Sequence, residues 1–182
     1  MRSIVFASFL ALFATAAAPA YAAEDNASLG YGPSHFSVGL QIGADVIASG
    51  WYSTALFGML IPVEYTFTLG PGALAIQSGF GLAAAEGWVT IQIPFGARYK
   101  IKLPVKGLFV YPFLQIGPAF TAKPTGAVGG FLQAGGGVSY FVHPNVELVA
   151  QPIGLGAMFG NWGGYSGGVF YYTFRVGAQF HF

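Results

Sequence analysis

The last fourteen residues of the chain, 169–182, alternate between two kinds of side chain along almost their whole length. One face is apolar and ends on an aromatic residue: Phe170, Tyr172, Phe174, Val176, Ala178, Phe180 and Phe182. The other face is mostly polar or small: Thr173, Arg175, Gly177, Gln179 and His181. Because residues i and i+2 of a β-strand share a face, this segment is predicted to be a strand with one apolar and one polar surface.

The N-terminus has the features of an export signal. A positive residue, Arg2, precedes an apolar run over 4–18, and the Ala-Tyr-Ala at 20–22 places small residues where a signal peptidase cleaves. We therefore expect 1–22 to be a cleaved signal peptide, followed by a short periplasmic segment over 23–34. The alternative is an uncleaved anchor, because the apolar segment is nearly long enough to span a bilayer.

Composition narrows the class of protein further. Only 7% of the residues are charged, against about a quarter in soluble domains, and the mean hydropathy is +0.61. After residue 22, every apolar run is interrupted before it reaches the ~18 residues that a membrane helix needs. An apolar chain of this kind is typical of a membrane β-barrel, since only helices and closed barrels satisfy their backbone groups in lipid. The chain has no cysteine, and its formal net charge of +1 gives no reason to expect nucleic acid as a partner.

Alternation with a period of two recurs in eight segments, each long enough for a tilted membrane strand. They lie at 35–47, 55–69, 73–84, 88–102, 108–121, 130–142, 146–157 and 169–182. The predicted fold is all-β, an eight-stranded antiparallel up-and-down transmembrane β-barrel over 35–182. Turns near 70, 104 and 144 are expected on the periplasmic side, and the connections at 48–54, 85–87, 122–128 and 158–168 on the outer side.

Five prolines fall within the predicted strands, and each removes a donor from the backbone ladder. Bulges or strand ends are therefore expected at Pro62, Pro94, Pro112, Pro118 and Pro152.

Short motifs in the middle of the chain resemble those of a known family of membrane barrels. The sequence IPFGARYK over 93–100 is similar to the "IP…(K/R)Y" strand of the OmpA-like, or "porin family", small outer-membrane β-barrels. The QIGP over 115–118 resembles the strand that follows it, and the GGGVSY over 135–140 with the turn at 143–145 resembles a later hairpin. Together with the terminal strand, the resemblance covers nearly the whole mature chain and implies a Gram-negative outer-membrane barrel. It specifies the fold group and not an activity.

The inward faces of the predicted strands carry the residues from which any interior chemistry must come. Twelve polar or charged residues are predicted to line the lumen: Gln41, Asp45, Glu64, Gln77, Gln92, Arg98, Gln115, Gln133, Glu147, Gln151, Arg175 and Gln179. They suit either a side-chain plug or a polar conduit, and the plug is the preferred interpretation, because eight strands enclose just enough space for side chains. Buried charges there must be paired, and Glu64 and Arg98 are predicted to meet across the lumen. Many inward glycines either leave volume for water or a ligand, or permit curvature.

Candidate catalytic and binding residues are few. His35, His143 and His181 are expected near strand ends on the periplasmic side as interface or turn residues, with no serine or metal-ligand partner at a useful spacing. Three lysines, Lys100, Lys102 and Lys106, are expected at one periplasmic turn, either solvated or touching an anionic partner. Aromatic residues near the outer connections suit a membrane-interface girdle or an apolar binding surface: Trp51, Tyr52, Phe159, Trp162 and Tyr165.

Three classes of function remain. The preferred one is a structural, membrane-integrity barrel with a plugged interior. The alternatives are a narrow channel or transporter for a small or apolar solute, as in OmpW-like barrels, and, more distantly, a lipid-modifying enzyme. No enzymatic activity, catalytic residue, cofactor or metal is expected. The expected partners are outer-membrane lipids and the barrel-assembly machinery, and a monomer is expected. The resemblance implies that this machinery reads Phe174, Phe180 and Phe182 as the assembly signal.

Overall fold

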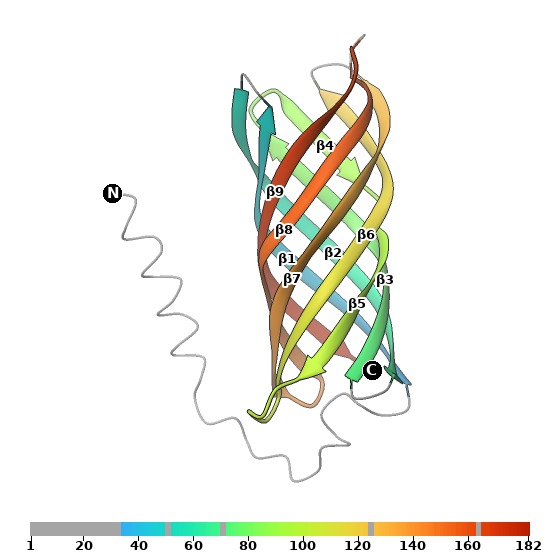
Figure 1. Ribbon diagram of the computed structural model, residues 1–182, viewed down its shortest axis with the longest axis vertical. Helices are drawn as coiled ribbons and strands as arrows, with labels where there is room; N and C mark the ends of the chain where they lie inside the picture. Colours follow the sequence, from blue (N-terminus) through green and yellow to red (C-terminus); the bar gives the residue numbers. More distant parts are fainter. Residues whose placement is uncertain (1–33, 50–51, 70–71, 124–125, 163–164) are drawn as a thin grey trace, which may run out of the picture.

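A computed structural model describes residues 34–49, 52–69, 72–123, 126–162 and 165–182 (Figure 1). The predicted signal peptide over 1–22, the segment over 23–33 and Trp51 lie outside the described residues. So do the side chains of Tyr52, Trp162 and Tyr165. Within the described ranges, no helix is long and apolar enough to cross a membrane.

Nine antiparallel strands form one sheet that closes on itself, because β1 pairs with both β2 and β9. The strands are β1 (Ser34–Ser49), β2 (Tyr52–Leu69), β3 (Gly72–Ala85), β4 (Trp88–Gln92), β5 (Phe95–Lys102), β6 (Leu108–Lys123), β7 (Ala127–His143), β8 (Val146–Trp162) and β9 (Tyr165–His181). β4 and β5 share one place in the ring, since both lie between β3 and β6. The predicted eight-stranded antiparallel barrel is therefore confirmed.

The predicted strand over 88–102 is divided in two at Ile93 and Pro94, which belong to neither β4 nor β5. Pro94 has no backbone N–H to donate, so a ladder bond is lost there, as the sequence predicts. The Ile93 N–H still donates to the carbonyl of Pro118 on β6 over 3.1 Å. A backbone hydrogen bond to β6 therefore remains between β4 and β5. The break therefore leaves the barrel wall closed.

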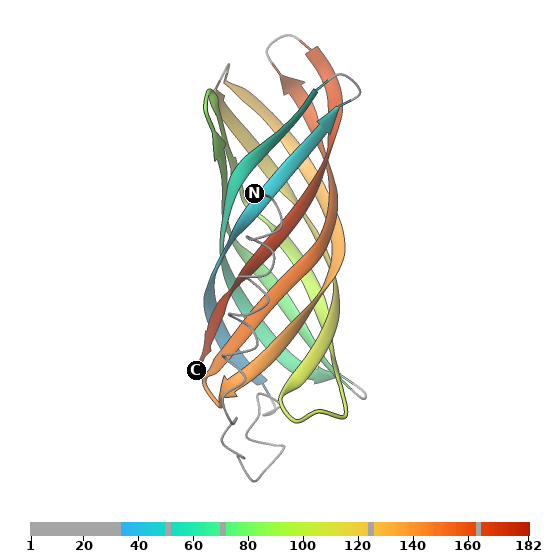
Figure 2. The ribbon, with the colours of Figure 1, turned by 90° about the vertical axis from the view of Figure 1, so that its left-hand side faces the viewer.

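The first strand begins and the last strand finishes at the same end of the barrel (Figures 1 and 2). We call the end where β1 begins and β9 finishes the terminal end, and the opposite end the distal end. The connections expected on the outer side at 48–54 and 158–168 are mostly strand, because β1, β2, β8 and β9 all extend into them. Two tight connections use glycine with a positive φ, Gly87 at the distal end and Gly107 at the terminal end.

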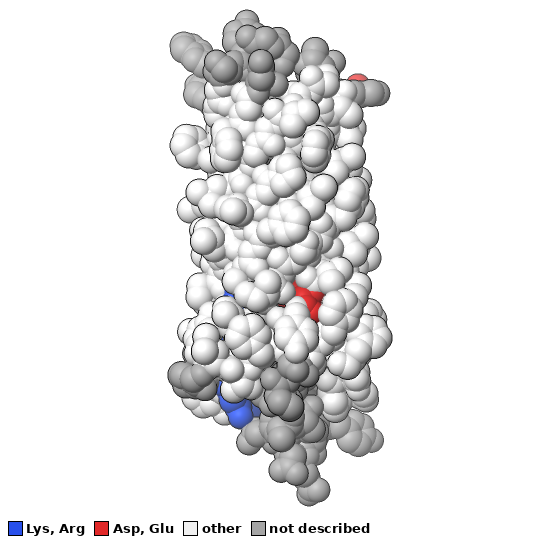
Figure 3. Space-filling model, turned by 90° about the vertical axis from the view of Figure 1, so that its right-hand side faces the viewer, with Lys and Arg blue, Asp and Glu red and all other residues white. Residues whose placement is uncertain are grey.

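The outer wall is apolar around the whole ring, as the alternation predicts. Phe36, Phe57, Ile76 and Leu155 are among the many large hydrophobic residues that lie exposed on it. On the face shown in Figure 3 the wall is mostly white, and colour occurs near the ends and, in the lower half of the wall, as a red patch and a small speck of blue. β1 and β2 have 16 and 18 residues, more than the roughly 9 to 11 that a tilted membrane strand needs. The wall is thus tall enough and apolar enough to cross a bilayer.

Neighbouring strands are staggered so that the ring closes with a shift along β1. A row of directly paired residues that starts at Ser37 returns to β1 at Ile47, ten residues further on. The row runs through Ser37, Glu64, Gln77, Gly96, Gln115, Gln133, Gly156, Tyr171 and Ile47. This shear tilts the strands and sets which inward side chains face one another across the lumen.

A bulge interrupts β8 at Pro152, which confirms the prediction for that proline. The register of β8 shifts between Gln151 and Gly154 against β9, and a matching shift occurs against β7. Pro152 and Ile153 are consecutive and both lie exposed on the outer wall. The hydroxyl of Tyr172 donates to the Pro152 carbonyl, so the freed carbonyl has a partner on a surface where lipid offers none.

The predicted bulges or strand ends at the other three prolines are wrong. Pro62, Pro112 and Pro118 lie within continuous strands and pair in register with Gly79, Gly136 and Gly130. The reason is that a strand has two sides, and a proline needs to lose a bond only on one of them. At Pro62, for example, the ladder to β3 is unbroken while the ladder to β1 skips the proline.

Candidate functional site

The interior near the terminal end holds a cluster of charges centred on Arg98. Its guanidinium Nη2 lies 2.5 Å from Glu64 Oε2 and 3.7 Å from Glu147 Oε2, and all three side chains are buried. These residues come from β5, β2 and β8, which are not neighbours in the ring. The predicted meeting of Glu64 and Arg98 across the lumen is confirmed.

An amide joins this cluster from a fourth strand. Gln179 on β9 accepts a hydrogen bond from Arg98 and donates one to Glu64 Oε1 over 2.9 Å. The side chain therefore satisfies both members of the ion pair at once. Such a bridge uses the donor and the acceptor that only an amide offers together.

Glu147 accepts bonds from two further residues. Lys100 Nζ lies 2.6 Å from Glu147 Oε2, and His181 Nε2 lies 2.9 Å from the same oxygen. The prediction that Lys100 belongs to a solvated turn is wrong, because its side chain points inward from β5 and is buried, whereas Lys102 and Lys106 are exposed. His181 is likewise a buried member of the cluster and not a residue of the rim.

Aromatic rings complete the terminal cluster. The Arg98 guanidinium lies 4.9 Å from the centre of the Tyr111 ring, and Lys100 Nζ lies 5.7 Å from that of Phe141. Both distances suit cation–π attraction in a desolvated place. Half-buried His35 stacks near His181 with ring centres 4.9 Å apart, so two of the three histidines meet here. His143 lies exposed at a turn.

The middle of the interior is polar with fewer charges. Arg175 Nη2 lies 3.1 Å from Asp45 Oδ1, so Arg175 pairs with its neighbour strand and does not join Glu64. Gln115 donates to Gln77 over 2.8 Å. The structure buries all twelve side chains predicted to line the lumen.

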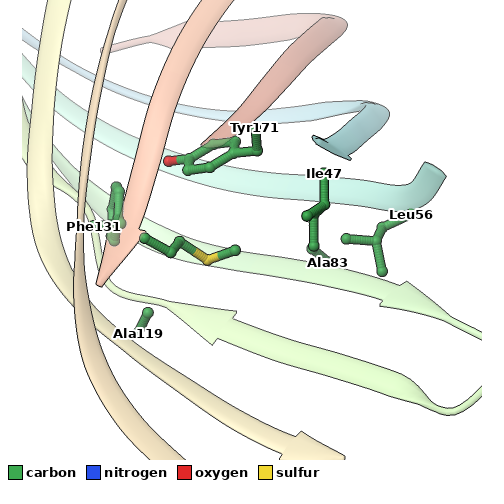
Figure 4. Close-up of a cluster of buried hydrophobic side chains, with 7 residues drawn as sticks. Ile47, Leu56, Ala83, Ala119, Phe131 and Tyr171 are labelled. Atoms are coloured by element: carbon green, nitrogen blue, oxygen red, sulfur yellow. The ribbon is translucent and has the colours of Figure 1, made fainter. Parts of the chain in front are cut away.

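The interior near the distal end is apolar. Buried side chains from seven strands meet in one layer: Ile47, Leu56, Ala83, Ala119, Phe131, Met158 and Tyr171 (Figure 4). We call this set the distal apolar layer. This layer was not predicted, although Ile47 follows Gln41 and Asp45 on the inward face of the same strand and was a signal for it. Polar neighbours are bonded within the protein: Thr90 Oγ1 lies 3.0 Å from Thr121 Oγ1, and Gln92 Nε2 lies 3.7 Å from Met158 Sδ.

Aromatic rings fill the space beside inward glycines. Tyr111 is paired with Gly137, where an added Cβ would lie 2.4 Å from the Tyr111 hydroxyl oxygen. Tyr171 covers Gly156 in the same way, with Cζ 2.3 Å from an added Cβ. Ring-over-glycine pairs of this kind are a known device of β-sheets. At these positions the volume left by glycine is occupied by a ring.

The chemistry of the interior is that of a bonded network. Across the described ranges, no group of three or more His, Asp or Glu side chains could hold a metal ion. The predicted assembly-signal residues lie apart from the interior: Phe180 and Phe182 are exposed, and the Phe182 N–H donates to the Phe36 carbonyl over 2.9 Å. Phe159, from the predicted outer girdle, is exposed on the wall of β8.

Known structures share this architecture at low sequence identity. Neisserial surface protein A is 18% identical with a TM-score of 0.61, and the match covers 81% of this chain and 97% of that one. Ail, the attachment invasion locus protein of Yersinia pestis, is 15% identical with a TM-score of 0.50, over 82% of this chain and 97% of that one. The outer membrane enzyme PagL matches at 12% identity, a TM-score of 0.47 and 78% and 97% coverage, and no conclusion follows from it. No protein-family model and no curated protein matches the sequence. The chain has the fold of the small outer-membrane β-barrel proteins.

Proposed function

We propose that this chain is an integral outer-membrane β-barrel protein with a structural role in membrane integrity, and that its interior does not conduct. The apolar wall supports the membrane location, since a soluble protein would not expose so many large hydrophobic side chains around its whole circumference. The fold shared with Neisserial surface protein A agrees with the same location.

The observation that carries the proposal is the position of Arg98. Its guanidinium reaches from β5 to carboxylates on β2 and β8 and to an amide on β9, so bonded side chains cross the lumen from wall to wall. An eight-stranded barrel encloses little more than this volume. A permeating solute would have to displace these contacts and leave buried charges without partners, which costs several kcal/mol.

Planar-bilayer recording of the refolded protein tests this proposal. We expect no single-channel steps from protein that shows the heat-modifiable mobility of a folded barrel on gels. Protein denatured before addition to the bilayer is the control for conductance caused by detergent or aggregates. Steady, reproducible steps from the folded fraction would overturn the non-conducting interior.

A narrow channel for a small solute is the second candidate. It is supported by the lining of amide side chains and by buried polar atoms on Gln41, Gln133 and Arg175 that lack a protein partner. Vesicle-swelling assays with small neutral solutes separate the two candidates. Uptake at the rate of protein-free vesicles supports the structural role, and faster uptake supports the channel.

We also propose that the barrel has no enzymatic activity. Of the three histidines, His181 bonds to Glu147, and His143 Nδ1 accepts from the Asn145 N–H over 3.2 Å. His35 lies beside His181, with ring centres 4.9 Å apart. None of these contacts offers an activated hydroxyl nucleophile. Lipid A and phospholipid incubated with the refolded barrel should therefore remain unchanged in mass, and a released fatty acid would contradict this.

Export and assembly complete the proposal. We expect cleavage of the signal peptide after residue 22, so that the mature protein in the outer-membrane fraction begins at Ala23. The partners are then outer-membrane lipids and the barrel-assembly machinery, and the barrel is a monomer. N-terminal sequencing of the membrane-extracted protein checks the cleavage, and light scattering in detergent checks the oligomeric state.

A further inference from the structure

Buried polar atoms without a protein partner are concentrated in one part of the interior. Thirteen such side-chain atoms occur among the residues that the structure describes. They belong to His35, Ser37, Gln41, Thr66, Arg98, Tyr111, Gln133, Ser139, Glu147, Tyr171, Arg175 and His181. Buried polar groups in folded proteins are almost always bonded to protein or to ordered water, so each of these atoms needs an explanation.

Most of these atoms lie near the terminal end. Strand pairing places His35 opposite Thr66, and Ser37 opposite both Glu64 and His181. Hydroxyls from β1 and β2, imidazole nitrogens from β1 and β9, and Glu147 Oε1 from β8 therefore surround one region. Donors and acceptors are both present, which suits water better than an ion of either sign.

Three of the thirteen atoms belong to arginine or glutamate side chains. Arg98 Nε and Glu147 Oε1 are each left without a protein partner, although Arg98 Nη2 and Glu147 Oε2 are bonded. An unsatisfied atom on a buried charge is more costly than one on a neutral group. Arg175 Nε, further along the interior, also lacks a protein hydrogen-bond partner. Water is the small molecule that can satisfy donors and acceptors spread along such a path.

The distal apolar layer has the opposite character. Of its seven side chains, six have no polar oxygen or nitrogen atom, and the seventh, Tyr171, contributes its hydroxyl as one of the thirteen atoms. An apolar layer of this kind stays dry, because a water molecule there finds too few partners. The layer spans the interior from β1 to β9 through the side chains of seven strands.

We propose that the terminal and middle parts of the interior bind a chain of water molecules, and that the distal apolar layer is the dry barrier that prevents permeation. Half-buried His35, beside the terminal rim, marks the entrance for water. The inference rests on the proposed non-conducting role in one respect only, the need for a barrier. It assigns that barrier to the apolar layer and not to the ion pairs around Arg98.

Water contacts in the wild-type barrel test the inference directly. In perdeuterated protein in lipid nanodiscs, magnetisation transfer from water should reach the backbone amides of Ser37, Thr66 and Ser139. It should not reach those of Ala83, Ala119 and Phe131. Equal transfer at both sets would overturn the inference, and so would transfer to the second set alone. Transfer to Ser37, Thr66 and Ser139 does not depend on conductance, so a wild-type channel would refute the proposed function and the dry barrier but not the bound water.

Matched substitutions locate the barrier. Ala83→Ser combined with Ala119→Ser places two hydroxyls in the apolar layer with little change in volume. Ala73→Ser combined with Ala75→Ser makes the same change at two fully buried positions on β3 near the terminal end. The first pair should raise osmotic water permeability of vesicles at least threefold over wild type, and the second pair should leave it unchanged. A rise with the second pair alone, or no rise with the first in folded protein, would place the barrier elsewhere.

Discussion

The two ends of the barrel interior are filled by different means, although the wall around them is the same. Near the terminal end, charged side chains from β2, β5 and β8 meet polar side chains from β9 within hydrogen-bonding distance. Near the distal end, apolar side chains from seven strands meet without charge. The charged cluster depends on each partner being present, whereas the apolar layer depends on the volume being filled. Loss of one side chain should therefore have different consequences at the two ends.

The largest effect is expected at the terminal end. Glu64→Ala removes the carboxylate nearest to Arg98 and one of the two bonds that hold Gln179. Breaking a buried pair by removing one partner typically costs about 3 to 5 kcal/mol. Chemical unfolding in detergent micelles, followed by loss of the heat-modifiable form, measures it. Glu86→Ala at the exposed distal turn is the control and should change stability by less than about 0.5 kcal/mol. Equal midpoints for the Glu64→Ala variant and wild type would mean that the ion pair is not formed.

A smaller effect is expected in the distal apolar layer. Met158→Ala leaves a cavity beside Phe131 and Tyr171, and buried methionine truncations cost about 2 to 4 kcal/mol. Met59→Ala, on the outer wall of β2, is the matched control, because lipid or detergent can fill the space that it leaves. If Met59→Ala lowers the stability as much as Met158→Ala, side chains in the distal apolar layer are no more tightly packed than side chains that face lipid.

A substitution on the outer wall should lower the stability less than either substitution in the interior. Tyr172→Phe removes the hydroxyl that donates to the Pro152 carbonyl at the β8 bulge, a contact worth about 1 kcal/mol. Unfolding of the variant in nanodiscs measures the loss, and Tyr65→Phe, another exposed wall tyrosine, provides the comparison. If the two substitutions are equally harmless, the bulge carbonyl does not need its partner.

The smallest effect on the finished barrel is expected at Phe182. Its ring is exposed and its centre lies 6.4 Å from that of Phe36, so deletion should change refolding into detergent very little. Insertion into the outer membrane of cells should fall, if the assembly machinery reads this residue. The ratio of folded to unfolded protein in membrane fractions measures it, with Phe36→Ala as a control at the same rim. Equal losses in cells and in detergent would mean that Phe182 is a structural residue only.

Much of the fold could be predicted because alternation is a local property. The inward and outward residues of the first two strands follow directly from period two, and so does the burial of Gln41, Glu64 and Arg98. Strand ends were less predictable. β1 and β8 continue into segments that were expected to be loops, because small and aromatic residues there are compatible with both states.

The partners inside the lumen could be predicted only in part, and the reason is geometric. Alternation determines which face a side chain occupies, but contacts across the lumen depend on the stagger from Ser37 to Ile47. That stagger results from all the strand registers together, and no single segment reports it. Glu64 and Arg98 were paired correctly because few inward charges were available. Lys100 and His181 were missed because their nearness to the rim suggested solvent.

The bulge at Pro152 reverses the phase of β8 halfway along its length. Before it, odd-numbered residues such as Glu147 and Gln151 point into the lumen; beyond it, even-numbered ones such as Met158 do, and Leu155 faces outward. One strand therefore contributes a carboxylate to the charged end and a thioether to the apolar end from opposite parities of the same alternation. Removing a single residue at this point would act like a frameshift in the wall, turning every side chain of the distal half of β8 from one face to the other.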